Sequence, residues 1–180
     1  MSKNGKKMPL DRLVICAFLV ALSIVCGKFL AIPVGEILRF SFENLPILFA
    51  GLVFGPIVGA LVGVSADLLG CILRGYAINP WVTLGALLIG LLAGVVSWVL
   101  RRCPLGWRVA LTVAVAHGIG SVAVKTIGLV AYYNFPLWEL MVWRLLNYVI
   151  VGAVEALLLY GLLRHPGIRR YLPGRKGGAQ

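Results

Sequence analysis

Residues 38–56 read LRFSFENLPILFAGLVFGP, a short apolar run with charge at its entrance and a stop signal at its end. Arg39 and Glu43 precede the run, and Gly55-Pro56 closes it. It offers about 14 residues, or roughly 21 Å of helix, against a bilayer hydrocarbon core of roughly 30 Å. Glycine ends helices readily, and proline suits the first turn of the next one. We therefore predict a short helix that ends below the membrane surface or is shielded by neighbours, followed by a tight hairpin.

The composition around this run places the chain in a membrane. Of the 180 residues, 61% are hydrophobic and only 13% are charged, with a mean hydropathy of +0.97. A soluble domain of this composition would lack a polar surface. The apolar runs are continuous rather than alternating, which favours helices over a barrel. The sequence predicts an all-α membrane protein, a six-transmembrane-helix bundle, in which the long helices cover residues 10–32, 56–73, 80–100, 107–133 and 137–163.

The net charge of +11 is explained by topology rather than by nucleic-acid binding. Most basic residues lie before the first predicted helix, between the fourth and fifth, or after the last. With six crossings, these three regions fall on one side, so the positive-inside rule places both termini in the cytoplasm of a prokaryotic cell. We expect a cytoplasmic tail at 1–9, a transmembrane substrate-binding domain at 10–164 and a basic cytoplasmic tail at 165–180.

The familiar catalytic motifs are missing from the sequence. It contains no phosphate-binding loop, no H-E-x-x-H and no G-x-S-x-G, and it has no large soluble domain on which catalysis could take place. The cysteines, at positions 16, 26, 71 and 103, are scattered without metal-ligand spacing. We therefore expect no enzyme activity, metal, cofactor or disulfide.

Charged residues inside the predicted spans point to a binding site. Asp67, Lys125, Arg144 and Glu155 fall within apolar segments. A charge at the bilayer centre costs about 2.5–3.5 kcal/mol on insertion scales, so such residues normally face the bundle interior or a cavity. Counting from the helix ends places the first three in the outer half of the membrane, with Arg39, Glu43, Arg74 and Asn79 at the outer rim.

Helical periodicity gathers the polar residues onto two faces. His117, Ser121 and Lys125 recur at spacings of four, and so do Arg144 and Tyr148, with Asn147 beside them and Glu155 further along the same face. One interpretation is that Asp67 pairs with Lys125 or Arg144 only to hold helices together. The other is that the basic groups exceed the acidic ones, so that an anionic ligand would offset the excess.

Small residues form further stripes. Gly59 and Gly63 share one face of the helix at 56–73, and Gly90 and Gly94 share one face of the helix at 80–100. Small residues let helix backbones approach closely in lipid, so we predict packing within this chain at both faces. On the first helix, the stretch AFLVA at 17–21 instead presents small residues where an interior helix would not need them.

The runs RFSFENLPILFAGLVFGPIVGALVGVSADLLG (39–70) and INPWVTLGALLIGLLAG (78–94) resemble the substrate-specific S components of energy-coupling-factor (ECF) vitamin transporters, most closely the folate-type members. The resemblance extends over all six predicted helices. It implies cytoplasmic termini and a vitamin bound near the outer face. It also implies an AxxxA motif, matched by Ala17 and Ala21, that docks on a shared transmembrane subunit working with two ATPase subunits.

Folate suits the polar residues of the outer half. Carboxylate and amide groups can hold its pterin, aromatic rings such as that of Trp143 can cover its faces, and basic groups can hold its glutamate. The predicted substrate-binding residues are Arg39, Glu43, Asp67, Asn79, Trp81, Lys125, Arg144, Asn147 and Tyr148. The loop at 79–84 reads NPWVTL, where folate-type members more often read FPGFTL, which leaves the vitamin open. Pantothenate is the alternative substrate, and a stand-alone transporter or channel, or a structural or signalling membrane protein, is the alternative class.

Overall fold

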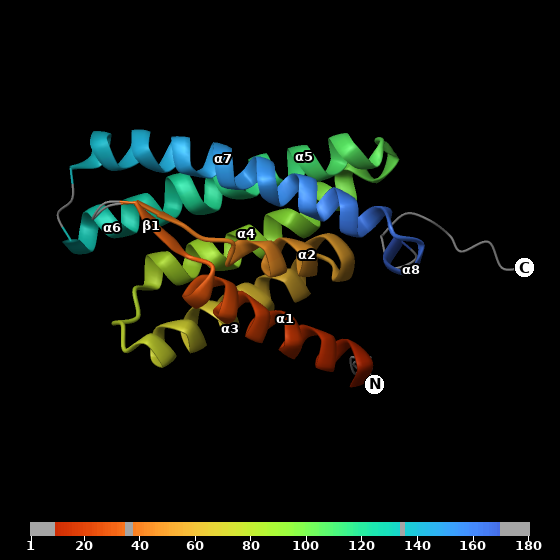
Figure 1. Cartoon of the computed structure of the whole chain (residues 1–180), viewed down its shortest axis with the longest axis horizontal. Helices are drawn as coiled ribbons and strands as arrows, with labels where there is room; N and C mark the ends of the chain where they lie inside the picture. Colours follow the sequence, from red (N-terminus) through yellow and green to blue (C-terminus); the bar gives the residue numbers. More distant parts are fainter. Residues whose placement is uncertain (1–9, 35–37, 134–135, 170–180) are drawn as a thin grey trace, which may run out of the picture.

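The computed structural model describes residues 10–34, 38–133 and 136–169 as a bundle of helices lying roughly side by side (Figure 1). In this part of the chain, five helical segments are long and apolar enough to cross a membrane. They are Leu10–Phe29 (α1), Pro56–Arg74 (α3), Pro80–Arg102, Leu105–Ala131 and Leu137–Arg164 (α7). The segment Pro80–Arg102 consists of the helix α4, Pro80–Val99, and the 3₁₀ turn η1, Leu100–Arg102. The all-helical membrane class predicted from the sequence is confirmed.

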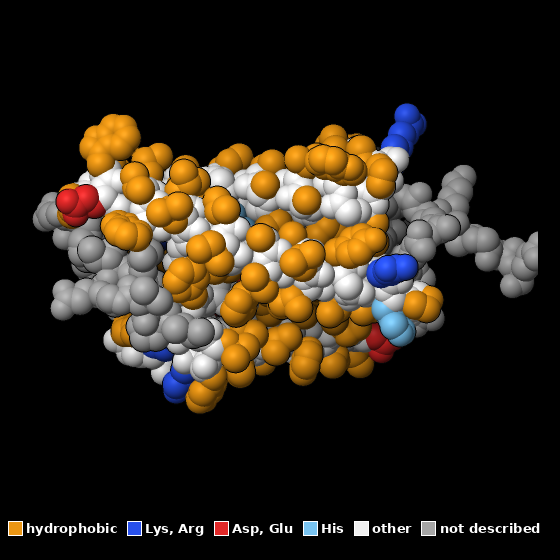
Figure 2. Space-filling model, turned by 45° about the horizontal axis from the view of Figure 1, so that its top comes forward, with side chains coloured by type: hydrophobic (Ala, Val, Ile, Leu, Met, Phe, Trp, Pro, Cys, Tyr) orange, Lys and Arg blue, Asp and Glu red, His pale blue; other side chains and the backbone are white. Residues whose placement is uncertain are grey.

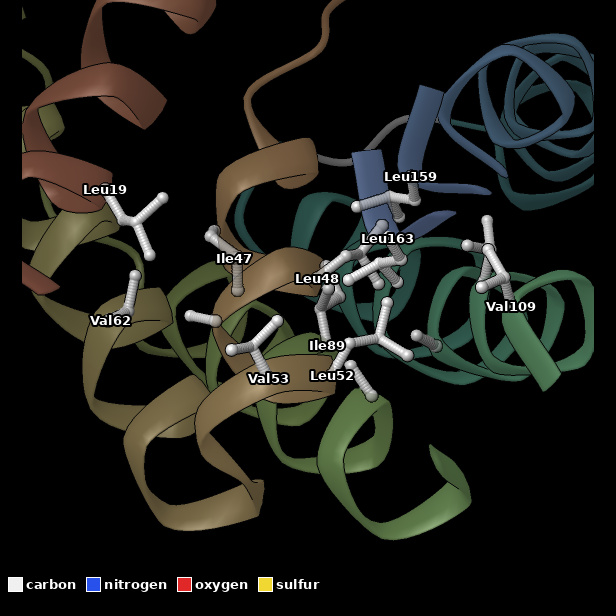
Figure 3. Packing of buried hydrophobic residues seen from close by; sticks show 14 of the residues in the cluster. Leu19, Ile47, Leu48, Leu52, Val53, Val62, Ile89, Val109, Leu159 and Leu163 are labelled. Carbon is white, nitrogen blue, oxygen red and sulfur yellow. The ribbon is translucent and has the colours of Figure 1, made fainter. Parts of the chain in front are cut away.

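The short helix α2, Asn44–Phe54, lies at the centre of the bundle. Most of its residues are buried, including Pro46, Leu48 and Leu52. In Figure 3, Leu48 and Leu52 point toward Ile89 of α4 and Leu163 of α7. The predicted shielding by neighbours is therefore confirmed, because apolar side chains of other helices cover α2.

The turn from α2 into α3 is made by Gly55-Pro56, as the sequence predicts. Gly55 has φ of 96°, a backbone conformation that glycine adopts without strain, and Pro56 begins α3. The two helices are thus joined by a single residue, which holds the end of α2 against the start of α3.

The first helix is shorter than predicted. α1 ends at Phe29 rather than at residue 32, and the chain then forms a small antiparallel hairpin of β1 (Ile32–Val34) and β2 (Leu38–Phe40). Pro33 explains the difference, because proline has no amide hydrogen to continue a helix and disfavours helical geometry in the preceding residue. The hairpin folds back beside α7, at the end of the molecule opposite the start of α1 (Figure 1).

The predicted helix at 107–133 is a continuous but irregular segment. It consists of α5 (Leu105–Ala116), a π-helical turn η2 (His117–Val124) and α6 (Lys125–Tyr133). π-Helical turns are rare and occur frequently at functional sites. The last described element is the single turn α8, Pro166–Arg169, which lies in the predicted C-terminal tail; the predicted N-terminal tail falls outside the described residues.

Glycines bring α3 and α4 into backbone contact. A side-chain carbon on Gly59 would collide with the backbone of Gly90, and one on Gly90 would collide with that of Gly59. Gly63 likewise faces the backbone of Ala86. The predicted packing of these small residues within the chain is confirmed, and it makes α3, α4 and α2 the compact core of the bundle.

The outer surface fits a lipid environment. Large apolar side chains such as Ile57, Trp138, Val149 and Leu157 are exposed around the bundle. In Figure 2, hydrophobic side chains cover the length of the visible face, whereas the charged side chains lie toward its two ends. Such an extended apolar surface is the mark of a membrane-embedded protein.

Candidate binding site

A cavity of about 350 Å³ opens at the end of the bundle where the hairpin lies. We name this the cavity end; the opposite end contains the start of α1, the α2–α3 turn, η1 and the end of α7 (Figure 1). The walls come from the last turns of α1 and α3, the first turns of α2 and α4, α6 and the first half of α7. Six predicted binding residues line it, namely Glu43, Asp67, Lys125, Arg144, Asn147 and Tyr148.

Glu43 stands between two cations at the mouth of the cavity. One carboxylate oxygen lies 3.8 Å from Arg74 Nη2, and the other lies 3.8 Å from Lys125 Nζ. The backbone carbonyl of Glu43 also accepts a hydrogen bond from Ser23 Oγ of α1 at 2.6 Å. This residue therefore connects α1, α3 and α6 at the point where the chain enters α2.

Asp67 does not pair with a cation in the described part of the chain. Its Oδ2 accepts a hydrogen bond of 2.6 Å from Thr83 Oγ1 of α4. The interpretation in which Asp67 pairs with Lys125 or Arg144 is thus wrong, because Lys125 approaches Glu43 and Arg144 lies elsewhere. The Asp67 carboxylate lies in the cavity wall, where it can accept hydrogen bonds from a ligand.

Arg144 is a partly buried cation in the cavity wall, and none of the described carboxylates pairs with it. Its Nη2 donates a hydrogen bond to the backbone carbonyl of Ser121 at 2.9 Å, and its guanidinium carbon lies 5.5 Å from the centre of the Tyr148 ring. Its Nε is buried and makes no hydrogen bond with the described residues. A guanidinium that lines a cavity and has no carboxylate partner among the described residues is suited to binding a ligand carboxylate.

Three predicted binding residues are not found among those lining the cavity. Asn79 caps α4, because its Oδ1 accepts from the Trp81 amide at 3.0 Å while its Nδ2 donates to the Gly128 carbonyl at 3.4 Å. Trp81 packs on Gly128 and is 42% exposed. Arg39 lies in β2, and its side chain is outside the described residues. The N-cap role at the start of α4 explains the residue type of Asn79.

Other cavity residues were not predicted as ligand contacts. Arg74 closes α3 immediately before Gly75, whose left-handed conformation ends the helix, and this places its guanidinium at the mouth. Asn44 is the first residue of α2; it is 1% exposed, and its Oδ1 makes no hydrogen bond within the part of the chain that the structure describes. Its position directly before an apolar run was the available signal, because a buried amide oxygen needs a donor.

Ala17 and Ala21, which the sequence predicts to dock on a partner subunit, lie on the exposed side of α1. The buried side of the same helix carries Cys16, Leu19 and Ser23, which face α2 and α3. Phe18 is 65% exposed beside the two alanines. The described chain thus leaves this face of α1 uncovered.

The comparisons with known proteins agree with this architecture. A family model described as "ECF-type riboflavin transporter, S component" matches residues 7–165. The curated relatives include the folate transporter FolT of Clostridium novyi (strain NT), 30% identical over 147 residues that make up 81% of this chain and 83% of the relative.

Two solved structures show the same fold. FolT bound with folic acid superposes with a TM-score of 0.71 at 25% identity, covering 85% of this chain and 92% of the other. The S component for biotin from an ECF-type ABC transporter superposes with a TM-score of 0.72 at 21% identity, covering 96% and 99%. The chain therefore belongs to the family of ECF-type transporter S components described by the riboflavin model, a family of multi-pass membrane transport proteins.

Proposed function

We propose that the cavity binds folate. The observation that carries this proposal is the Arg144 guanidinium, which lines the cavity and has no carboxylate partner among the described residues. A ligand carboxylate would complete its hydrogen bonding and neutralise its charge at once. The glutamate part of folate provides such carboxylates.

The remaining cavity residues suit the heterocycle of folate. The Asp67 carboxylate can accept hydrogen bonds from the amino and ring N–H groups of a pterin, and the Asn44 amide lines the same cavity. Tyr148 lines the same wall, where its hydroxyl can donate or accept a hydrogen bond. The cavity volume of about 350 Å³ lies at the lower end of the range for small-molecule sites.

The relatives support this choice of vitamin. The curated relative at 30% identity is named a folate transporter, and a solved structure at 25% identity holds folic acid. Riboflavin is the second candidate, because the matching family model names it. Its flavin ring would suit Tyr148 and Asn44, but a neutral vitamin would leave Arg144 without a counter-charge.

We further propose that uptake depends on partner subunits. Arg101, Arg102 and Arg164 lie at the end opposite the cavity, which the positive-inside rule places in the cytoplasm, so the cavity faces the outside. The exposed alanine face of α1 would dock on the shared transmembrane subunit, which works with two ATPase subunits. This chain would supply ligand binding, and its partners would supply the energy of transport.

Titration calorimetry of the detergent-solubilised protein tests the vitamin. We expect folate to bind with a submicromolar Kd in the absence of ATP, with weaker or no binding of riboflavin, pantothenate and thiamine. Heat from another vitamin and none from folate would contradict the substrate proposal and leave the family unaffected.

A further inference from the structure

A buried polar network lies directly behind the cavity wall. His117 of η2 is 3% exposed, and Glu155 of α7 and Ser121 of η2 are fully buried. His117 Nε2 lies 2.5 Å from Glu155 Oε2, and His117 Nδ1 lies 3.0 Å from Ser121 Oγ. None of these residues lines the cavity. They cannot contact a ligand there, so their effect on binding must pass through other side chains.

The network meets the cavity through a stack of three side chains. The His117 and Tyr148 rings are stacked, with centroids 4.9 Å apart and an interplanar angle of 24°. The Arg144 guanidinium lies over the Tyr148 ring at 5.5 Å. The order is therefore imidazole, phenol, guanidinium, of which the last two form part of the cavity wall.

Ser121 connects both ends of this stack. Its hydroxyl is within hydrogen-bonding distance of His117, and its backbone carbonyl accepts from Arg144. His117, Tyr148, Arg144 and Ser121 thus form a closed ring of contacts between η2 and α7. A closed ring restricts each side chain more than a single contact would, because moving one of them breaks two interactions.

Glu155 anchors this ring at a high energetic cost. A fully buried carboxylate between membrane helices is expensive, and an apolar residue would pack the position without that cost. The contact of Glu155 with His117 Nε2 holds the imidazole in one orientation.

We propose that His117 and Glu155 are positioning residues of the binding site: through Ser121 and ring stacking they fix Tyr148 and Arg144 in the orientation that receives the ligand. This proposal rests on the proposed function for its ligand. The fixed orientation matters because affinity is lost when binding must first order mobile side chains. Glu155 and His117 therefore set affinity without touching the vitamin.

Calorimetry with folic acid on Glu155 variants tests the effect on affinity. Glu155→Leu removes the partner of His117, and we expect folate binding at least tenfold weaker. Glu155→Gln keeps a hydrogen-bond acceptor of the same shape and should stay within threefold of the wild type. Glu139→Leu is the matched control, because Glu139 is an exposed carboxylate on the same helix, and it should bind normally. Equal affinities for Glu155→Leu and the wild type at matched folding would overturn the proposal.

A second measurement needs no ligand. 3-Fluorotyrosine incorporated at position 148 reports the environment of that ring by ¹⁹F NMR. We expect one narrow line in the wild type and a shifted or broadened line in both Glu155→Leu and Ser121→Ala. Ser121→Ala removes only the hydroxyl, so it is the milder variant to use if Glu155→Leu folds poorly. If the wild type binds no folate, the proposed function fails, but the spectrum still tests whether the network fixes the Tyr148 ring. Identical lines in the wild type and in Ser121→Ala would refute the positioning role.

Discussion

Arg144 donates a hydrogen bond from Nη2 to the backbone carbonyl of Ser121 at 2.9 Å, and in the described part of the chain this neutral group, not a carboxylate, anchors the guanidinium. Lys125 differs, because its Nζ lies 3.8 Å from Glu43. Of the three cations that line the cavity, Arg74 and Lys125 thus already approach the Glu43 carboxylate, whereas the charge of Arg144 is still to be balanced.

The Arg144→Ala variant should bind folate at least tenfold more weakly while its melting temperature stays close to that of the wild type. The loss follows from removing the counter-charge of a ligand carboxylate in a partly dry site. Arg144→Lys is the matched variant: it keeps the charge but loses the planar fork, so intermediate affinity is expected. Calorimetry and thermal unfolding in the same detergent measure both quantities.

The Lys125→Ala variant should also weaken folate binding at least tenfold. It removes a cation from the cavity and leaves Glu43 with Arg74 as its remaining basic neighbour among the described residues. Normal affinity combined with much earlier melting of both Lys125→Ala and Arg144→Ala would show instead that these residues hold helices together.

The Ala17→Trp variant separates binding from transport. A bulky side chain on the exposed face of α1 should push a partner helix away without disturbing the cavity, which lies toward the other end of the bundle. We expect unchanged folate affinity in the isolated chain, together with loss of uptake in cells that make the transmembrane subunit and both ATPases. Ala153→Trp, at an exposed alanine on α7, is the control and should transport normally. A transport-competent Ala17→Trp would show that this face is not the docking surface.

The Gly90→Ala variant should lower stability, because a methyl group at this position collides with the Gly59 backbone of α3. Overpacking of this kind typically costs about 1–3 kcal/mol, and the melting temperature in detergent should fall. Gly161→Ala is the control: Gly161 is exposed on α7 with open space around it, so no loss is expected there. Equal melting temperatures for the two variants would argue against the close α3–α4 contact.

The thiol of Cys71 provides a test of the cavity and of its orientation. Cys71 lines the cavity, whereas Cys103 is exposed beyond η1 at the opposite end. A membrane-impermeant methanethiosulfonate added to intact cells should modify Cys71, and folate should slow that reaction. Cys103 should react only after lysis. Modification of Cys103 alone in intact cells would invert the proposed topology.

The sequence by itself determined the membrane environment, the helices and the faces on which polar residues gather. These features follow from local properties of the chain. The length of an apolar run indicates a membrane-spanning helix, polar residues four positions apart share one helix face, and Gly55-Pro56 makes a turn. The folate-type resemblance was likewise carried by short motifs, and the family match confirms the S component family. Asp67, Lys125 and Arg144 line the cavity for a similar reason, since charges within spans must face the interior.

Only the tertiary structure decided which groups meet. Periodicity fixes the face of a helix, but not its rotation against a neighbour or where the tip of a long side chain ends. Asp67 therefore accepts a hydrogen bond from Thr83 rather than pairing with a cation. The Glu43 carboxylate lies near both Arg74 and Lys125. Asn79 caps α4 and is not among the residues that line the cavity. The contact between His117 and Glu155 joins residues 38 positions apart on two helices. The two side chains meet only when η2 packs against α7, so no local pattern in the sequence predicts this contact.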